Sequence, residues 1–162
     1  MIKEDCFGCI FSILSYQIYY IMHRIIYLSS SIAHLSLEEI NSLLLQSRKF
    51  NAQNDISGVL LYIDGDFLQV IEGQKTVITS LFEKIKKDTR HKGIITVFND
   101  QLLERQFPDW SMGFGYSDFE RLRKITGFEN IVKKELQNIT DKTAMIFLET
   151  FIKTHRDKIV FI

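Results

Sequence analysis

The sequence predicts an α+β sandwich of the ferredoxin-like type, in which helices cover both faces of one β-sheet. From about His23 the hydrophobic pattern follows the order β-α-β-β-α-β, and a further extended piece and helical segments come after it. The expected strands are apolar on both faces: in Phe67–Ile71, only Gln69 is polar. Helices must therefore lie on both sides of the sheet.

Local signals mark the first strand and the first helix. An apolar run predicts a strand over about His23–Ser29. The helix begins with a capping box, because Ser36 can act as N-cap and Glu39 lies three residues later. Its apolar residues share one face: Ile40, Leu43, Leu44 and Phe50. The helix is expected to end near Asn51.

A hairpin and a second helix follow. Strands are expected over Gly58–Ile63 and Phe67–Ile71. Asp64 and Gly65 between them are a short-range hairpin signal, because glycine accepts positive φ freely. The second helix follows Gly73, and its apolar residues form a wide core stripe: Val77, Ile78, Leu81, Phe82 and Ile85. The two helices are expected to cover the same face of the sheet.

The last elements are a strand, an extended piece and several helices. The fourth strand is expected over Ile94–Phe98, and the extended piece near Trp110–Phe114. Helices are expected over about 118–125, 129–137 and 142–155. They are rich in large apolar residues, so we expect them to cover the second face of the sheet.

The chain is expected to form one domain over residues 23–116, with an apolar leader over 1–22 and a helical extension over 117–162. Hydrophobic residues make up 46% of the chain and charged residues 25%, which is ordinary for a soluble globular protein. The 20 basic and 20 acidic residues cancel, so there is no general attraction to nucleic acid or to a membrane surface.

The leader fits neither a membrane span nor a signal peptide. Its apolar run, Ile10–Met22, is shorter than the roughly 20 residues that a span needs and contains Gln17. A signal peptide needs a basic start, whereas two acidic residues follow Lys3. An extra packed element, a disordered leader and a natural start at Met22 all stay open, and we favour the last.

Cys6 and Cys9 are the only cysteines and lie in the leader. They could form a redox pair or half a metal site, but no further ligands accompany them, so we interpret them as incidental thiols and expect no metal. A disulfide scaffold is excluded, which suits a reducing compartment and predicts a cytoplasmic protein.

Gln69 is the strongest candidate for contact with a ligand. An amide in mid-strand between large hydrophobic residues is costly unless something hydrogen-bonds it. Tyr27 points to the same face of the sheet as Gln69 if the first and third strands pair. Asn51, at the end of the first helix, would lie above that face. A ligand pocket is therefore predicted between the two helices, with Tyr27 and Gln69 as its floor. A core tyrosine, a glutamine satisfied by backbone and a C-capping asparagine are the alternative interpretations.

Short motifs over about His23–Tyr116 resemble the BLUF domain, a family of flavin-holding blue-light receptors. The matching segments are Ile25–Ser30, Phe50–Asn54, Ser57–Tyr62, Phe67–Gly73, Asp88–His91 and Trp110–Met112. The resemblance implies FAD, or less often FMN, between the two helices, and a photoreceptor rather than an enzyme. Phe50 departs from the pattern, because many members have a polar residue there. The departure bears on spectral tuning rather than on flavin binding.

The resemblance also implies a role for each pocket residue. Tyr27 would give an electron and then a proton to the excited flavin, and Gln69 would bridge Tyr27 and the flavin O4 and N5 atoms. Rotation or tautomerisation of the amide would then shift the absorption to the red, and the sequence leaves both open. Asn51 would hold the flavin N3 edge, and Leu43 and Ile85 would sandwich the ring.

Further residues are expected at the ends of the flavin. Candidates for the ribityl-phosphate end are three basic residues: Lys84, Arg90 and His91. Solvated charges at a helix end are the alternative interpretation. Asp88 would order this loop. Trp110 and Met112 would lie on the edge strand nearest Gln69 and report the state of the flavin to the C-terminal helices.

The predicted function is blue-light reception, relayed to a partner protein or to an oligomer interface. Only residues 117–162 follow the expected domain, so we expect no catalytic output domain and predict a homo-oligomer. A small flavin oxidoreductase and a ligand-sensing or dimerisation module without flavin are the alternatives. RNA binding lacks its Lys/Arg-Gly-aromatic signature. The output partner, the dark-recovery rate and the oligomer stoichiometry stay open.

Overall fold

The protein is seen in a computed structural model that describes residues 22–109, 111–117 and 142–156. The expected leader up to residue 21, Trp110 and the expected helices over about 118–125 and 129–137 lie outside the described residues. The described elements are β1 (Met22–Ser31), α2 (Leu37–Gln53), β2 (Ser57–Ile63), β3 (Asp66–Gln74), α3 (Lys75–Lys86), β4 (His91–Leu102), β5 (Gly113–Ser117) and α6 (Lys142–Arg156).

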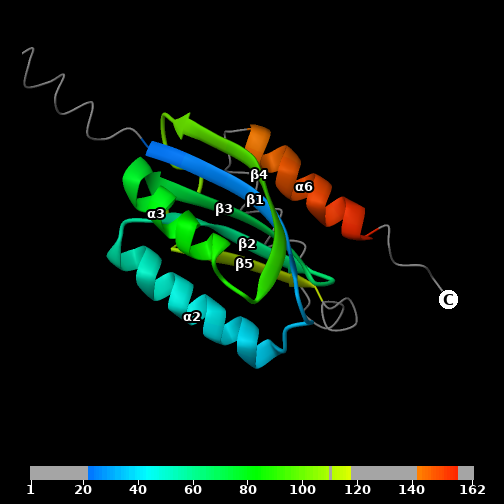
Figure 1. Cartoon of the computed structure of the whole chain (residues 1–162). Helices are drawn as coiled ribbons and strands as arrows, with labels where there is room; N and C mark the ends of the chain where they lie inside the picture. Colours follow the sequence, from blue (N-terminus) through cyan, green and yellow to red (C-terminus); the bar gives the residue numbers. More distant parts are fainter. Residues whose placement is uncertain (1–21, 110, 118–141, 157–162) are drawn as a thin grey trace, which may run out of the picture.

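The strands form one sheet in the order β4-β1-β3-β2-β5, in which β5 runs parallel to β2 and all other neighbours are antiparallel. Helices α2 and α3 lie against one face, and α6 lies against the other (Figure 1). The predicted α+β sandwich with helices on both faces is therefore confirmed. The apolar strands explain it, because each inner strand buries side chains on both sides.

Local chemistry forms the first helix and the hairpin as predicted. The Ser36 hydroxyl accepts from the Glu39 N–H at 3.3 Å, and the Glu39 carboxylate accepts from the Ser36 N–H at 2.8 Å. Between β2 and β3, Asp64 and Gly65 both have positive φ, at 52° and 88°. This is the backbone of a tight two-residue hairpin turn, and it sets the register of β3 on β2.

The fourth strand is longer than predicted, because β4 begins at His91 and not near Ile94, and continues to Leu102. Most of its side chains are exposed or only half buried. It lies at the edge of the sheet with β1 as its one neighbour, so its side chains need no continuous apolar pattern. The fifth strand begins at Gly113, three residues later than the extended piece that was expected from Trp110.

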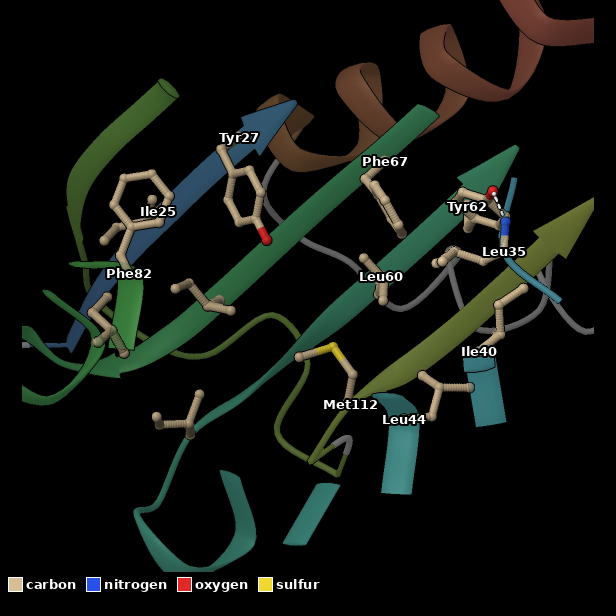
Figure 2. Close-up of a cluster of buried hydrophobic side chains, with 13 residues drawn as sticks. Ile25, Tyr27, Leu35, Ile40, Leu44, Leu60, Tyr62, Phe67, Phe82 and Met112 are labelled. Carbon is tan, nitrogen blue, oxygen red and sulfur yellow. Dashed lines mark hydrogen bonds between the residues drawn. The ribbon is translucent and has the colours of Figure 1, made fainter. Parts of the chain in front are cut away.

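Two cores sit on the two faces of the sheet. The core under α2 and α3 includes Tyr27, Leu60, Tyr62 and Phe67, which Figure 2 shows on one side of the strands. The Tyr62 hydroxyl accepts from the Leu35 N–H at 3.0 Å, which ties the entry to α2 onto this face. The core under α6 gathers other side chains: Ile26, Val59, Leu61, Leu68, Val70, Phe107, Ala144, Leu148 and Phe151. The first of these two cores borders a pocket.

Candidate functional site

A pocket of about 350 Å³ opens between α2 and α3 on the face of the sheet that carries Tyr27. This volume lies in the range of small-molecule sites. All nine residues predicted to bind the ligand line it: Tyr27, Leu43, Asn51, Gln69, Lys84, Ile85, Asp88, Arg90 and His91. The structure thus brings together residues from β1, α2, β3, α3, β4 and the turn before β4.

The floor of the pocket is the pair Tyr27 and Gln69, which are direct neighbours in the β1–β3 register. Both side chains are buried, and the Tyr27 hydroxyl donates a hydrogen bond to Gln69 Oε1. Burial raises the pKa of the Tyr27 phenol above its ordinary value, and the negative charge of Asp88 adds to this shift. The phenol is therefore neutral at physiological pH and acts as the donor in this pair.

The other end of the Gln69 amide is held weakly. Its Nε2 donates to the sulfur of Met112 at 3.5 Å, and a thioether is a weak acceptor. Since an amide nitrogen carries two hydrogens, Gln69 keeps donor capacity for a ligand in the pocket. The interpretation of Gln69 as a residue satisfied by neighbouring backbone is wrong, because its partners are Tyr27 and Met112.

The prediction that Met112 lies on an edge strand beside Gln69 is wrong. It precedes β5, and β2 separates β5 from β3. It reaches Gln69 because its side chain is buried in the core beneath α2 and α3, on the pocket side of the sheet (Figure 2). Its predicted partner Trp110 is outside the described residues.

Asn51 lies in the last turn of α2 and is buried. Its Nδ2 donates to the Ser111 carbonyl at 2.6 Å, so it joins α2 to the residues that precede β5. The alternative interpretation of Asn51 as C-cap is wrong, because Asn54 caps this helix. Ser111 was not predicted at the site, since a contact across 60 positions of sequence leaves no local signal.

Charged residues gather at the α3 end of the pocket. Asp88 accepts from the Arg90 side chain at 2.9 Å and from the Arg90 N–H at 2.9 Å, which orders the turn before β4. The bond to Arg90 holds the pKa of Asp88 below its ordinary value. Lys84 places its ammonium 5.2 Å from the centre of the Phe50 ring and makes no ion pair among the described residues.

His91 lines the pocket with both ring nitrogens already engaged. One contacts the Ser29 hydroxyl and the other the Ile85 carbonyl, each at 2.9 Å. Since a carbonyl only accepts, Nε2 carries a hydrogen. His91 therefore presents its ring to the pocket, not a free nitrogen.

Sequence reasoning missed residues whose contribution depends on contacts from distant parts of the chain. The guanidinium of Arg48 donates to the Met112 carbonyl at 3.0 Å, which fixes Met112 from the α2 side. Arg48 gives no sequence signal, because it reads as an ordinary helix charge. Leu35, Gln46, Ser47 and Leu81 also line the pocket. Of these, only Leu81 was marked, as part of the α3 stripe.

The described residues offer little for two other classes of site. Nowhere in the part of the chain that the structure describes do three or more potential metal ligands gather. No described helix is both long and apolar enough to cross a membrane.

Comparison with known families matches residues 22–113 to the model described as "BLUF: Sensors of blue-light using FAD". The chain belongs to the BLUF family. This match runs from β1 to the first residue of β5 and so contains the whole pocket. Residues 22–113 therefore form a blue-light-sensing domain, and BLUF domains bind a flavin.

Relatives and solved structures support this membership. The chain is 33% identical over 87 residues to the photoactivated adenylate cyclase subunit beta of Euglena longa, a match that covers 53% of this chain and 10% of that protein. It thus spans about a tenth of the length of that curated relative. BlrB, a BLUF protein in its dark state, is 29% identical with a TM-score of 0.59, and the match covers 74% of this chain and 95% of BlrB. BlsA in its photo-activated state is 30% identical with a TM-score of 0.58, with coverage of 73% and 94%.

Proposed function

We propose that the whole protein is a blue-light photoreceptor in which Tyr27 and Gln69 form the switch and FAD occupies the pocket. The hydrogen bond from the Tyr27 hydroxyl to Gln69 Oε1, at the floor of a pocket between two helices, is the observation that carries this proposal. A flavin fits the residues present: apolar side chains from both helices face the pocket, and amides from Asn51 and Gln69 offer donors and acceptors to its polar edge.

Bound flavin supplies the absorption of blue light and, once excited, a strong oxidant. With flavin bound, Tyr27 would give it an electron, and the phenol proton would move along the hydrogen bond to Gln69 Oε1. Both would return to Tyr27 once the Gln69 amide has rearranged, so that no net oxidation remains. Gln69 then rotates or tautomerises, so that the atom that accepted from Tyr27 is replaced by a donor. The bond from Nε2 to the Met112 sulfur is weak enough to be given up in this step.

Two rearranged hydrogen bonds can supply enough energy for signalling. Each is worth on the order of 1 kcal/mol, and a few kcal/mol biases an element that has two arrangements. Met112 is the described residue that contacts Gln69 and continues directly into β5, so the change leaves the pocket through this segment. We propose that the signal passes to a partner protein or a homo-oligomer interface in the cytoplasm, and that the chain itself has no enzymatic activity.

A contact between Lys84 and the phosphate end of the flavin can be tested, because Lys84 lines the pocket and has no ion pair among the described residues. If Lys84 meets the phosphate end, Lys84→Met is expected to weaken FAD and FMN binding about fivefold and riboflavin binding less than twofold. Titration of the apoprotein with the three flavins measures this. Lys87→Met, outside the pocket, is the matched control. Equal losses for all three flavins would show that Lys84 does not face the phosphate.

The main experiment is the difference spectrum between lit and dark samples of the purified flavin-loaded protein. We expect a red shift of the flavin absorption band under blue light and full recovery in the dark. Light-independent oxidation of a reduced nicotinamide would support the flavin oxidoreductase instead. Failure to bind any flavin after reconstitution would support a ligand-sensing or dimerisation module.

A further inference from the structure

Glu72 is a buried carboxylate on β3, three residues beyond Gln69 and on the opposite face of the sheet. Its side chain has no exposed surface. Glu72 Oε2 accepts from the N–H groups of Gln106 at 2.9 Å and Phe107 at 3.2 Å. Its Oε1 has no hydrogen-bond partner in the described part of the chain. Such a group is expensive to bury, so a role beyond packing is indicated.

The two N–H groups belong to the segment 103–112, which connects β4 to β5. Phe107 is buried in the core on the α6 side of the sheet, and Met112 is buried in the core on the pocket side. Phe107 and Met112 therefore lie on opposite faces of the sheet. Glu72 holds its first part, whereas Asn51 and Gln69 contact its last part.

We propose that Glu72 is a positioning residue for the light switch: its carboxylate fixes the segment 103–112 on the sheet and thereby sets Met112 against Gln69. The inference rests on the switch proposed above, because Met112 matters only if the Gln69 amide rearranges. Glu72 is suited to this role because β3 carries both groups. One strand thus holds the amide on one face and the anchor of its neighbour on the other.

The charged groups around Glu72 come from several elements. Arg24 of β1 and Arg105 of the segment attract its negative charge. Arg24 is also paired with Asp100 of β4, and Arg105 with Asp55, each at 2.7 Å. On β2 its register partner is the uncharged Ser57. Helix α6 buries the apolar Ala144 and Leu148 on this face, and its one buried titratable residue among those described, His155, contacts Asp66 at the start of β3.

The proton state of Glu72 should change the strength of this anchor. Burial raises the pKa of Glu72 to about 7, although the two N–H bonds and the two arginines act in the opposite direction. Above this pH the carboxylate is ionised, and its bonds to the segment are charge-assisted and about twice as strong. Below it the neutral acid holds the segment less firmly. A segment that is held more firmly disfavours the light-induced state, in which Met112 has moved away from Gln69. Return to the dark state should therefore be faster at high pH.

The test is the rate of dark recovery of the flavin band in the full flavin-loaded chain between pH 6 and 8.5. We expect recovery to be about tenfold slower at pH 6 than at pH 8.5, with a midpoint near the pKa of Glu72. Glu72→Gln keeps the acceptor oxygen and the volume but not the charge. It is expected to recover slowly at every pH, with an unchanged size of red shift.

Asp109→Asn is the matched control, because Asp109 is an exposed carboxylate on the same segment. It should keep the pH dependence of the unmodified chain. A flat profile in the unmodified protein, or an unchanged profile in Glu72→Gln, would overturn the inference while the photoreceptor stands. Absence of any red shift in the unmodified protein would instead defeat the proposed function. If Glu72→Gln does not fold, the pH dependence of dark recovery in the unmodified chain still tests the inference.

Discussion

Replacement of Gln69 by leucine is expected to abolish the light-driven red shift while flavin stays bound. Leucine has a similar volume but offers neither donor nor acceptor, so the Tyr27 hydroxyl loses its acceptor and the Met112 sulfur loses its donor. The apolar walls contributed by α2 and α3 are unchanged, which is why flavin affinity should change only a few-fold. The readout is the lit-minus-dark spectrum at equal flavin content.

Tyr27→Phe should give the same loss by a different route, because phenylalanine keeps the ring and removes the oxidisable hydroxyl. Tyr62→Phe is the matched control. Tyr62 is equally buried in the same core, but its hydroxyl accepts from the Leu35 N–H and does not contact Gln69. It is expected to keep the full red shift at a stability cost of about 1 kcal/mol. A normal photocycle in Gln69→Leu or in Tyr27→Phe would refute the assigned mechanism.

Gly58→Ala is expected to destabilise the domain by roughly 3 kcal/mol or more, or to prevent folding. A Cβ at this position of β2 would lie 2.0 Å from the carbonyl oxygen of Val70 on β3. That oxygen is backbone and cannot rotate away, so the two strands would have to separate. The φ of 153° adds strain, since residues other than glycine rarely adopt it.

Gly93→Ala is the matched control for Gly58→Ala. Gly93 has a φ of 65°, but a Cβ there would have nothing within 4 Å. Only the left-handed backbone should then matter, at a cost of about 1 kcal/mol. Denaturant unfolding of both variants gives the comparison. Equal losses of stability would show that the approach of β2 to β3 is not what requires glycine at position 58.

Much of the fold was predictable because its signals are local. The capping box at Ser36 and Glu39 and the Asp64–Gly65 turn depend on residues a few positions apart, and both are confirmed. The length of β4 was not predictable from an apolar pattern, because an edge strand with mostly exposed side chains lacks one. Polar residues in such a strand look like a loop until the neighbouring strand is known.

The site was predictable where a residue type was out of place, and not where it was ordinary. A glutamine inside an apolar strand is costly unless it has a hydrogen-bond partner, and this alone predicts the pocket. Glu72 gave no such warning, because an acidic residue at the end of an apolar strand reads as its exposed terminus. Its burial depends on backbone N–H groups 34 and 35 positions away. Met112 was predicted as a signalling residue, but its contact with Gln69 joins residues 43 positions apart and leaves no local signal in the sequence.

The position of Tyr27 and Gln69 within the sheet also limits how much of the backbone the proposed switch can disturb. β1 and β3 each have a paired strand on both sides, and on β3 the pairing with β1 and β2 is regular through Gln69. If the proposed switch operates, a change in the side-chain torsions of Gln69 can therefore occur without breaking the backbone hydrogen bonds of β3. Repeated illumination of the proposed receptor is then expected to leave the sheet folded.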